Sequence, residues 1–323
     1  MIALRAWLSC VDMRTPDALV LGGGGTLGEA WMWAVLAGLE QAGGFDAGGC
    51  DSYVGTSAGS IVAALLAAGV SPQDRLARDG FVDLLGAAAD VDDSGAVARV
   101  LGGAGERALG AIAPLAPLAL ASAHLPRALL GRTVLRALPA GRRSLRMLGR
   151  TVDRMGARFD GRLRVVAVEL ASGRRVVFGA PGAPALAAGL AVEASCAIPG
   201  VFRPVTVGGR EYVDGGVWSP TSIDAAPARR GEELLCLNPT ASLRPTIGSP
   251  AGAFGAVSRA IAGAESLTMR RRGVRTTTIG PDRASAAAMG LNLMDGRRRR
   301  DVVDAGLAQG RRLAGDGLSA EAA

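Results

Sequence analysis

A single serine between two glycines is the first candidate for chemistry in this chain. Residues 55–59 read GTSAG, with Ser57 at the centre and Gly55 and Gly59 at the ends. Small neighbours allow a sharp turn that exposes the serine hydroxyl at the N-terminus of a following helix, where the partial positive charge favours an alkoxide. Ser57 is therefore a candidate nucleophile. A chain with 47 glycines also produces this motif by chance, so a structural turn is the alternative.

A glycine-rich stretch earlier in the chain could bind a negative charge. Residues 22–28 read GGGGTLG and follow a short apolar run. The candidate donors are the backbone N–H groups of Gly23, Gly24, Gly25 and Thr26, directed at a developing oxyanion. The same stretch fits the GxGxxG loop of dinucleotide-binding proteins, which needs an acidic residue after a second strand about 20 residues later. Asp46 lies near that distance but follows no strand pattern, and a glycine turn without a ligand is the third interpretation.

An aspartate near residue 214 is the third candidate. Residues 212–216 read YVDGG, so Asp214 leaves an apparent strand just before two glycines. Such a position can direct the carboxylate toward a neighbouring loop. The competing interpretation is an ordinary Asp-Gly turn, in which the side chain bonds its own backbone.

The scarcity of histidine and cysteine excludes several mechanisms. His124 is the one histidine, so two-histidine zinc hydrolysis is excluded, and a Ser-His-Asp triad requires His124 as its base. A lone histidine among apolar neighbours is more often structural, and we expect His124→Ala to keep most of the hydrolytic activity. A loss comparable to that of Ser57→Ala in a folded protein would contradict this expectation. The cysteines are too scattered for a disulfide framework or a metal site: Cys10, Cys50, Cys196 and Cys236.

The hydrophobic pattern predicts the elements that position these residues. The first segments predict a buried strand over 17–22, a helix over 29–41, a strand over 52–54, a turn over 55–59 and a helix over 60–68. This alternation of strands and helices predicts an α/β fold with a parallel sheet. Later segments predict a hairpin, a helix, a second hairpin and two further strands. Their ranges are 163–170 with 175–178, 184–194, 203–207 with 211–213, 234–237 and 274–279.

Taken together and in this order, the motifs resemble the patatin-like phospholipase family. The resemblance rests on the glycine-rich loop, on GTSAG, on ASCAIPGVFRP at residues 194–204, and on Asp214 with its two following glycines. It covers roughly residues 17–69 and 163–239. The implied fold is a central, mostly parallel sheet flanked by helices, with a helical insertion after the nucleophile helix. The insertion itself shows nothing that aligns.

The resemblance implies a serine–aspartate dyad that cleaves lipid or phospholipid carboxyl esters without a metal or organic cofactor. Ser57 is then the acyl acceptor, Asp214 takes its proton, and residues 23–26 supply the oxyanion hole. An aspartate with an ordinary pKa is a poor base for serine, so desolvation must raise its basicity. The family usually has Arg or Lys where Leu27 stands, and a decayed site there would make the chain a catalytically silent lipid-binding protein. The other alternative is a dinucleotide-binding oxidoreductase that uses the Gly23–Gly28 loop.

Length and charge predict how the rest of the chain is organised. The 323 residues are 49% hydrophobic and carry a net charge of +7, which excludes disorder for most of the chain. We expect an N-terminal extension over 1–16 (with Met13 as an alternative start), one domain over 17–312 with an insertion over 74–158, and a low-complexity tail over 313–323. We also expect a cytoplasmic protein. An aromatic content of 4% argues against nucleic-acid binding.

The predicted insertion has an unusual charge pattern. Residues 107–150 contain eight arginines and no acidic residue. Arginine binds phosphate well, so this segment could be a lid or a surface for peripheral contact with anionic lipid. The alternative is that these arginines form an ordinary solvated surface over a buried core of alanine and leucine. Equal sedimentation with neutral and anionic liposomes would exclude the docking role.

Overall fold

The structure is a computed structural model that describes residues 15–77, 141, 143–243 and 250–316. His124, Cys10, most of the predicted insertion, the first 14 residues of the predicted extension and the last seven of the predicted tail lie outside the described residues. Helix α12 (Arg299–Asp316) includes residues 313–316, where we expected the tail to begin.

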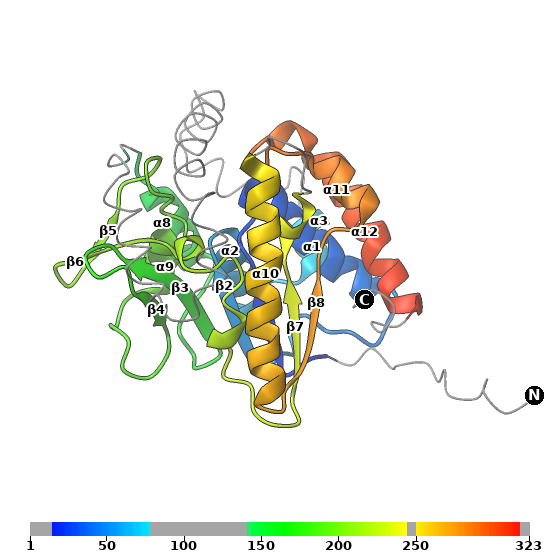
Figure 1. Ribbon diagram of the computed structural model, residues 1–323, viewed down its shortest axis with the longest axis horizontal. Helices are drawn as coiled ribbons and strands as arrows, with labels where there is room; N and C mark the ends of the chain where they lie inside the picture. The colour runs from blue at the N-terminus through cyan, green and yellow to red at the C-terminus, as the bar shows by residue number, and fades with distance from the viewer. Residues whose placement is uncertain (1–14, 78–140, 142, 244–249, 317–323) are drawn as a thin grey trace, which may run out of the picture.

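The described strands form one mixed sheet, and the α/β fold is confirmed (Figure 1). The strand order is β5-β6-β3-β2-β1-β7-β8, with β4 also paired to β3. Strands β3, β2, β1, β7 and β8 are parallel, whereas β4, β5 and β6 join by antiparallel pairing. The bounds are β1 Ala18–Leu21, β2 Ser52–Thr56, β3 Leu163–Glu169, β4 Arg175–Phe178, β5 Val205–Val207, β6 Arg210–Asp214, β7 Glu233–Leu237 and β8 Arg275–Ile279.

Helices cover both faces of the parallel part of the sheet. Their bounds are α1 Gly25–Gln41, α2 Ala58–Ala67, α3 Pro72–Ala77, α8 Arg146–Arg154, α9 Ala188–Ser195, α10 Pro250–Arg271, α11 Arg283–Met289 and α12. Strand β1 is completely buried, and its alternate residues point to opposite faces. Leu19 and Leu21 belong to the core that includes side chains of α1 and α2, whereas Ala18 and Val20 belong to the core that includes side chains of α10. Burial on both sides explains why this strand is an uninterrupted apolar run.

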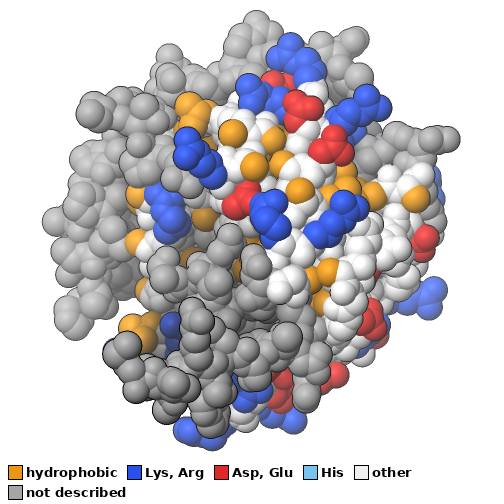
Figure 2. Space-filling model, turned by 90° about the vertical axis from the view of Figure 1, so that its right-hand side faces the viewer, with side chains coloured by type: hydrophobic (Ala, Val, Ile, Leu, Met, Phe, Trp, Pro, Cys, Tyr) orange, Lys and Arg blue, Asp and Glu red, His pale blue; other side chains and the backbone are white. Residues whose placement is uncertain are grey.

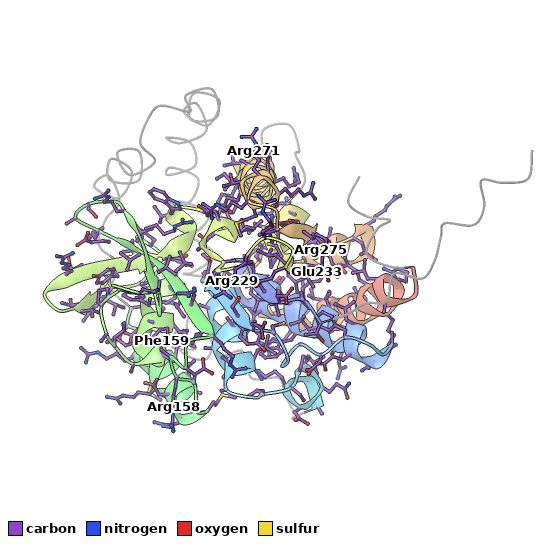
Figure 3. All side chains as sticks on the ribbon, turned by 90° about the horizontal axis from the view of Figure 1, so that it is seen from below. Arg158, Phe159, Arg229, Glu233, Arg271 and Arg275 are labelled. Atoms are coloured by element: carbon purple, nitrogen blue, oxygen red, sulfur yellow. The ribbon has the colours of Figure 1, made fainter. Side chains whose placement is uncertain are left out.

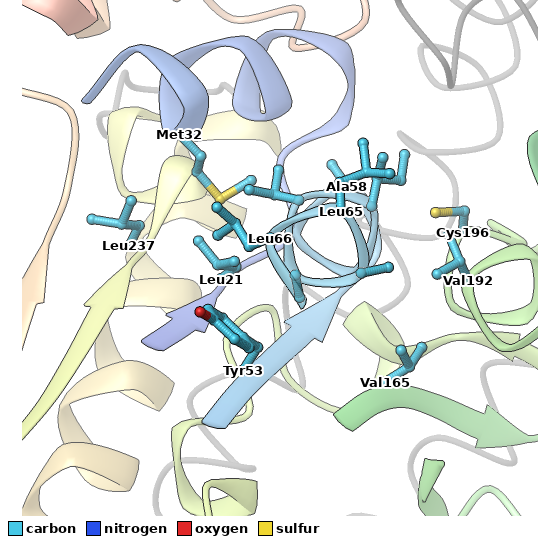
Figure 4. Packing of buried hydrophobic residues seen from close by; sticks show 14 of the residues in the cluster. Leu21, Met32, Tyr53, Ala58, Leu65, Leu66, Val165, Val192, Cys196 and Leu237 are labelled. Carbon is cyan, nitrogen blue, oxygen red and sulfur yellow. The ribbon is translucent and has the colours of Figure 1, made fainter. Parts of the chain in front are cut away.

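Helix α2 lies in the middle of the larger core. Every residue from Ala58 to Leu66 is buried. Figure 4 shows the surroundings of this helix, with Leu21 and Met32 on one side and Val192 and Cys196 on the other. Dense packing around α2 gives the turn before it a rigid support.

Two helix starts differ from the sequence expectation. Helix α1 begins at Gly25, four residues before the predicted start, so part of the glycine-rich stretch is its first turn. Helix α9 begins after Ala187, whose backbone is extended, instead of at residue 184. Glycine has a low helix propensity, and the prediction for α1 therefore excluded residues that tertiary packing makes helical.

The last helix packs closely against the first. A Cβ atom on Gly310 would lie 2.3 Å from the Val35 carbonyl oxygen, and one on Gly38 would lie 2.5 Å from that of Leu307. The indole N–H of Trp31 donates to Gln309 at 3.0 Å. The α1–α12 contact therefore depends on small residues that bring the two backbones together.

The visible surface has mixed charge. On the face in Figure 2, arginine and acidic side chains are interspersed, with apolar side chains between them. Figure 3 views the end where β7 and β8 begin, and there Arg275 lies beside Glu233 in an exposed ion pair of 2.9 Å. Such a pair contributes at most about 1 kcal/mol. Among the described helices, none is both long enough and apolar enough to cross a bilayer.

Candidate active site

Ser57 has a backbone conformation that side-chain-bearing residues rarely adopt. It is the single residue between β2 and α2, with φ 52° and ψ −127°. The turn predicted over 55–59 is thus reduced to one residue, because β2 continues to Thr56 and α2 starts at Ala58. Positive φ at a non-glycine residue stores strain of about 1–3 kcal/mol and is common at functional sites.

The two glycines of the GTSAG motif permit close backbone contacts. A Cβ on Gly55 would lie 2.4 Å from the Cα of Ser60, and a Cβ on Gly59 would lie 2.0 Å from the carbonyl oxygen of Leu21. Both distances are far shorter than any real contact. The sharp turn at Ser57 therefore needs glycine at both positions.

We expect Gly59→Ala to destabilise the fold by about 3 kcal/mol or more, since the contact is with backbone that cannot move aside. The matched control is Gly263→Ala in α10, where a Cβ would meet nothing within 4 Å. Helix propensity predicts that this control is neutral or stabilising by up to about 1 kcal/mol. Urea unfolding of both variants measures the difference, and equal midpoints would contradict the close-contact argument.

Sheet pairing brings Asp214 next to Ser57. Strand β3 pairs with Thr56 of β2 through Val166, and with Asp214 of β6 through the next residue, Ala167. The Ser57 hydroxyl lies close enough to the Asp214 carboxylate to lower its pKa. The same carboxylate accepts the Gly216 N–H at 2.7 Å. The Asp-Gly turn suggested by the sequence is therefore present, and it leaves the carboxylate facing the serine.

Burial changes the proton affinity of this aspartate. The Asp214 side chain lies almost entirely away from solvent, and burial raises its pKa from 3.8 to about 6. The nearby Ser57 hydroxyl and the hydrogen bond from Gly216 act in the opposite direction and offset part of the rise. The result is a carboxylate that is more basic than usual and still ionised at neutral pH, which is what a proton acceptor requires.

The glycine-rich loop presents some of its backbone donors and uses others internally. The N–H of Gly23 donates to the Pro220 carbonyl at 2.7 Å, and the N–H of Leu27 donates to that of Leu293 at 2.9 Å. Within the described residues, no acceptor faces the donors between them. These are the N–H groups of Gly24, Gly25 and Thr26. Gly23 instead lies against the serine, since a Cβ there would be 3.4 Å from the Ser57 Cβ.

Leu27 has a structural place in the loop. Its side chain is completely buried in the larger core, where a cation would require a partner. A Cβ on the neighbouring Gly25 would lie 2.5 Å from the Met294 sulfur, so the chain after α11 packs directly on the loop. The departure from the usual Arg or Lys therefore leaves the backbone donors in place.

The dinucleotide interpretation finds no support at Asp46. This residue lies in a turn before β2, and its carboxylate accepts the Gly48 N–H at 2.9 Å. It is therefore not at the end of a second strand, where a ribose contact would place it. In the described part of the chain, no three His, Cys, Asp or Glu side chains gather closely enough to hold a metal ion.

One partner of the candidate nucleophile was missed by the sequence analysis. The N–H of Ser57 donates to the hydroxyl of Ser195 at 2.9 Å. Ser195 is part of the ASCAIPGVFRP stretch, which sequence reasoning used only to support a resemblance. No spacing rule connects two residues 138 positions apart, so only the folded structure assigns this contact.

Comparisons with known proteins show which family this chain resembles. The family model described as patatin-like phospholipase matches residues 19–227. Among solved structures, VipD from Legionella pneumophila matches with a TM-score of 0.45 and 15% identity, over 93% of this chain and 67% of that chain. ExoU from Pseudomonas aeruginosa, in its complex with SpcU, matches with a TM-score of 0.35 and 25% identity, over 90% and 52%. The chain thus spans about half the length of ExoU. No curated protein matches this chain.

Proposed function

Because the chain belongs to the patatin-like phospholipase family, we propose that it hydrolyses carboxyl esters of lipids or phospholipids through a dyad of Ser57 and Asp214. The observation that carries this proposal is that sheet pairing places Ser57 beside the buried Asp214 carboxylate, whose pKa is raised by burial. A serine held at positive φ directly before the buried helix α2 supports the same role.

The proposed reaction has two halves with balanced proton transfers. Asp214 takes the hydroxyl proton of Ser57 as the serine oxygen attacks the ester carbonyl carbon. The negative charge that forms on the carbonyl oxygen is stabilised by backbone N–H groups from Gly24, Gly25 and Thr26. Collapse of this intermediate breaks the ester bond, and the leaving alcohol takes the proton from Asp214. Water then attacks acyl-Ser57 with Asp214 as the base, which releases the fatty acid and restores the serine.

The test of the proposal is labelling by a fluorophosphonate, which reacts with activated serines. We expect one adduct per chain by intact mass, and peptide mass spectrometry should locate it on Ser57. Heat-unfolded protein is the control, because it has the same serines without their activation. The labelled protein should also lose its release of fatty acid from phosphatidylcholine vesicles.

Two results would contradict the proposal. A folded protein that gives no adduct and releases no fatty acid has no activated serine. An adduct on another serine would place the nucleophile elsewhere. Vesicle binding without hydrolysis favours a silent lipid-binding protein, and a co-purified nucleotide favours the dinucleotide-binding alternative.

Activity should depend on pH through the ionisation of Asp214. The reacting form is the carboxylate, so kcat/KM should rise with pH and level off above an apparent pKa of about 6. At pH 5 about one enzyme molecule in ten is ionised at this residue, and we expect activity about tenfold below its value at pH 8. Stopped assays on a soluble ester measure the profile, with circular dichroism as a check of folding. A flat profile between pH 5 and 8 would remove Asp214 as the base.

A further inference from the structure

The backbone of Ser57 is bound through a hydroxyl that the dyad does not use. Strands β2 and β3 pair as far as Thr56 and Val166. The next donor along β2 is the N–H of Ser57, which donates to the Ser195 hydroxyl at 2.9 Å. That hydroxyl in turn donates to the Val166 carbonyl at 2.6 Å. Ser195 is completely buried, so its hydroxyl extends the hydrogen bonding between the strands beyond their last residue pair.

The other backbone group of Ser57 is bound from its own helix. Its carbonyl accepts the N–H of Ser60 at 2.8 Å and the Ser60 hydroxyl at 2.6 Å. With N–H and carbonyl both bound, the peptide units on either side of Ser57 are fixed, and so is its positive φ. The direction of the serine side chain follows from that backbone. Ser195 supplies the only one of these bonds that comes from outside the β2–α2 unit.

The segment that carries Ser195 also binds the backbone of Asp214. The N–H of Asp214 donates to the Ala197 carbonyl at 3.0 Å. Val166, the acceptor for Ser195, is adjacent to Ala167, which pairs with Asp214 in the sheet. The end of α9 therefore contacts the backbone of both dyad residues, and it relates their positions to each other.

We propose that Ser195 is a positioning residue of the dyad, whose hydroxyl holds the Ser57 backbone so that its side chain faces Asp214. This inference rests on the proposed function. Ser195 exchanges no proton with the substrate, and both of its hydrogen bonds go to backbone groups. Its removal leaves a buried N–H without its acceptor, and we expect Ser57 to move in response. A displacement near 1 Å can reduce the rate about 100-fold.

The test compares Ser195→Ala with a buried serine remote from the dyad. Ser285→Ala in α11 is the matched control, since that hydroxyl is also completely buried and donates to Gln309 at 2.9 Å. For Ser195→Ala we expect kcat to fall about 10- to 100-fold, KM to change less than twofold, and the fluorophosphonate labelling rate to fall by the same factor as kcat. The activity limb near pH 6 should move to higher pH, because a displaced Ser57 no longer lowers the pKa of Asp214, whereas burial still raises it. Ser285→Ala should keep the wild-type kcat.

Two further measurements separate positioning from simple loss of folding. Ser195→Cys keeps the size but has a weak donor and acceptor, and it should also lower kcat if Ser195→Ala does not fold. Amide hydrogen exchange of residues 57–60 should be faster in the Ser195 variants than in Ser285→Ala. If the wild type is reactive and a Ser195 variant has the wild-type kcat and the wild-type exchange rate, the positioning role is wrong and the proposed function stands. A wild type without labelling or hydrolysis overturns the proposed function, and the positioning role with it.

Discussion

Replacing Ser57 with alanine is expected to lower kcat/KM by about 10⁶-fold and to abolish fluorophosphonate labelling, because the bond-forming oxygen is removed. Three features of the structure act on this one residue: the glycines on either side, the buried helix α2 and the neighbouring Asp214 carboxylate. The measurement is fatty acid release by purified protein at pH 8, with circular dichroism to show that the variant is folded. Retention of a hundredth of the wild-type rate would assign the nucleophile to another residue.

A glycine at position 57 separates the chemical role from the strain. Ser57→Gly should be as inactive as Ser57→Ala, but more stable than Ser57→Ala by about 1 kcal/mol, since glycine adopts φ near 52° without steric cost. Urea unfolding of the two inactive variants isolates this difference. Equal stability would mean that the backbone at this position is not strained.

Replacing Asp214 with asparagine is expected to lower kcat about 10⁴-fold while making the protein more stable at neutral pH. The amide is nearly the same size and can still accept the Gly216 N–H, so the fold is preserved. It cannot take a proton from Ser57, so the serine loses its base. For scale, asparagine in place of the aspartate that orients the base of a Ser-His-Asp triad costs about 10⁴-fold. Single-turnover assays on a soluble ester measure the rate.

The stability gain follows from the direction of the pKa shift. A carboxyl group with a pKa raised from 3.8 to about 6 stabilises the fold when protonated, and that contribution is lost as the pH rises from about 4 to about 6. The loss is about 3 kcal/mol, and asparagine does not undergo it. Asp214→Asn should therefore be roughly 2–3 kcal/mol more stable than wild type at pH 8 and no more stable near pH 3.5. A variant less stable than wild type at pH 8 would contradict the burial argument.

The sequence predicted those features that depend on neighbouring residues. The alternation of apolar runs and glycine turns predicted β1, β2 and the helix after each, and the hairpin of β3 and β4 was also predicted correctly. Ser57 was identified because the small residues that permit its sharp turn lie within two positions on either side of it. Asp214 was a weaker candidate, since an ordinary Asp-Gly turn explained the two glycines after it equally well.

Contacts between distant segments could not be predicted. The N–H of Gly23 is bound by Pro220, and that of Leu27 by Leu293, which narrows the candidate oxyanion donors to three residues. Nothing in the glycine pattern shows which N–H groups are already bound. The contact of Ser195 with Ser57 belongs to the same class, since it depends on how α9 packs against β3 and α2. The assignment of roles within a loop thus requires the tertiary fold.

The position of β1 between β2 and β7 affects how the chain can fold during synthesis. Strand β2 follows β1 closely, whereas the N–H of Glu233 at the start of β7 reaches back to Asp17 across 216 residues. At about 5–20 residues per second, a ribosome needs roughly 10–40 seconds to make that interval, and during this time one edge of β1 has no native partner. The N–H groups of Gly22 and Gly23 also lack their acceptors until Leu237 and Pro220 have been synthesised. A nascent chain therefore contains Ser57 long before it can organise the loop beside it, and esterase activity should appear only after β7 has been translated.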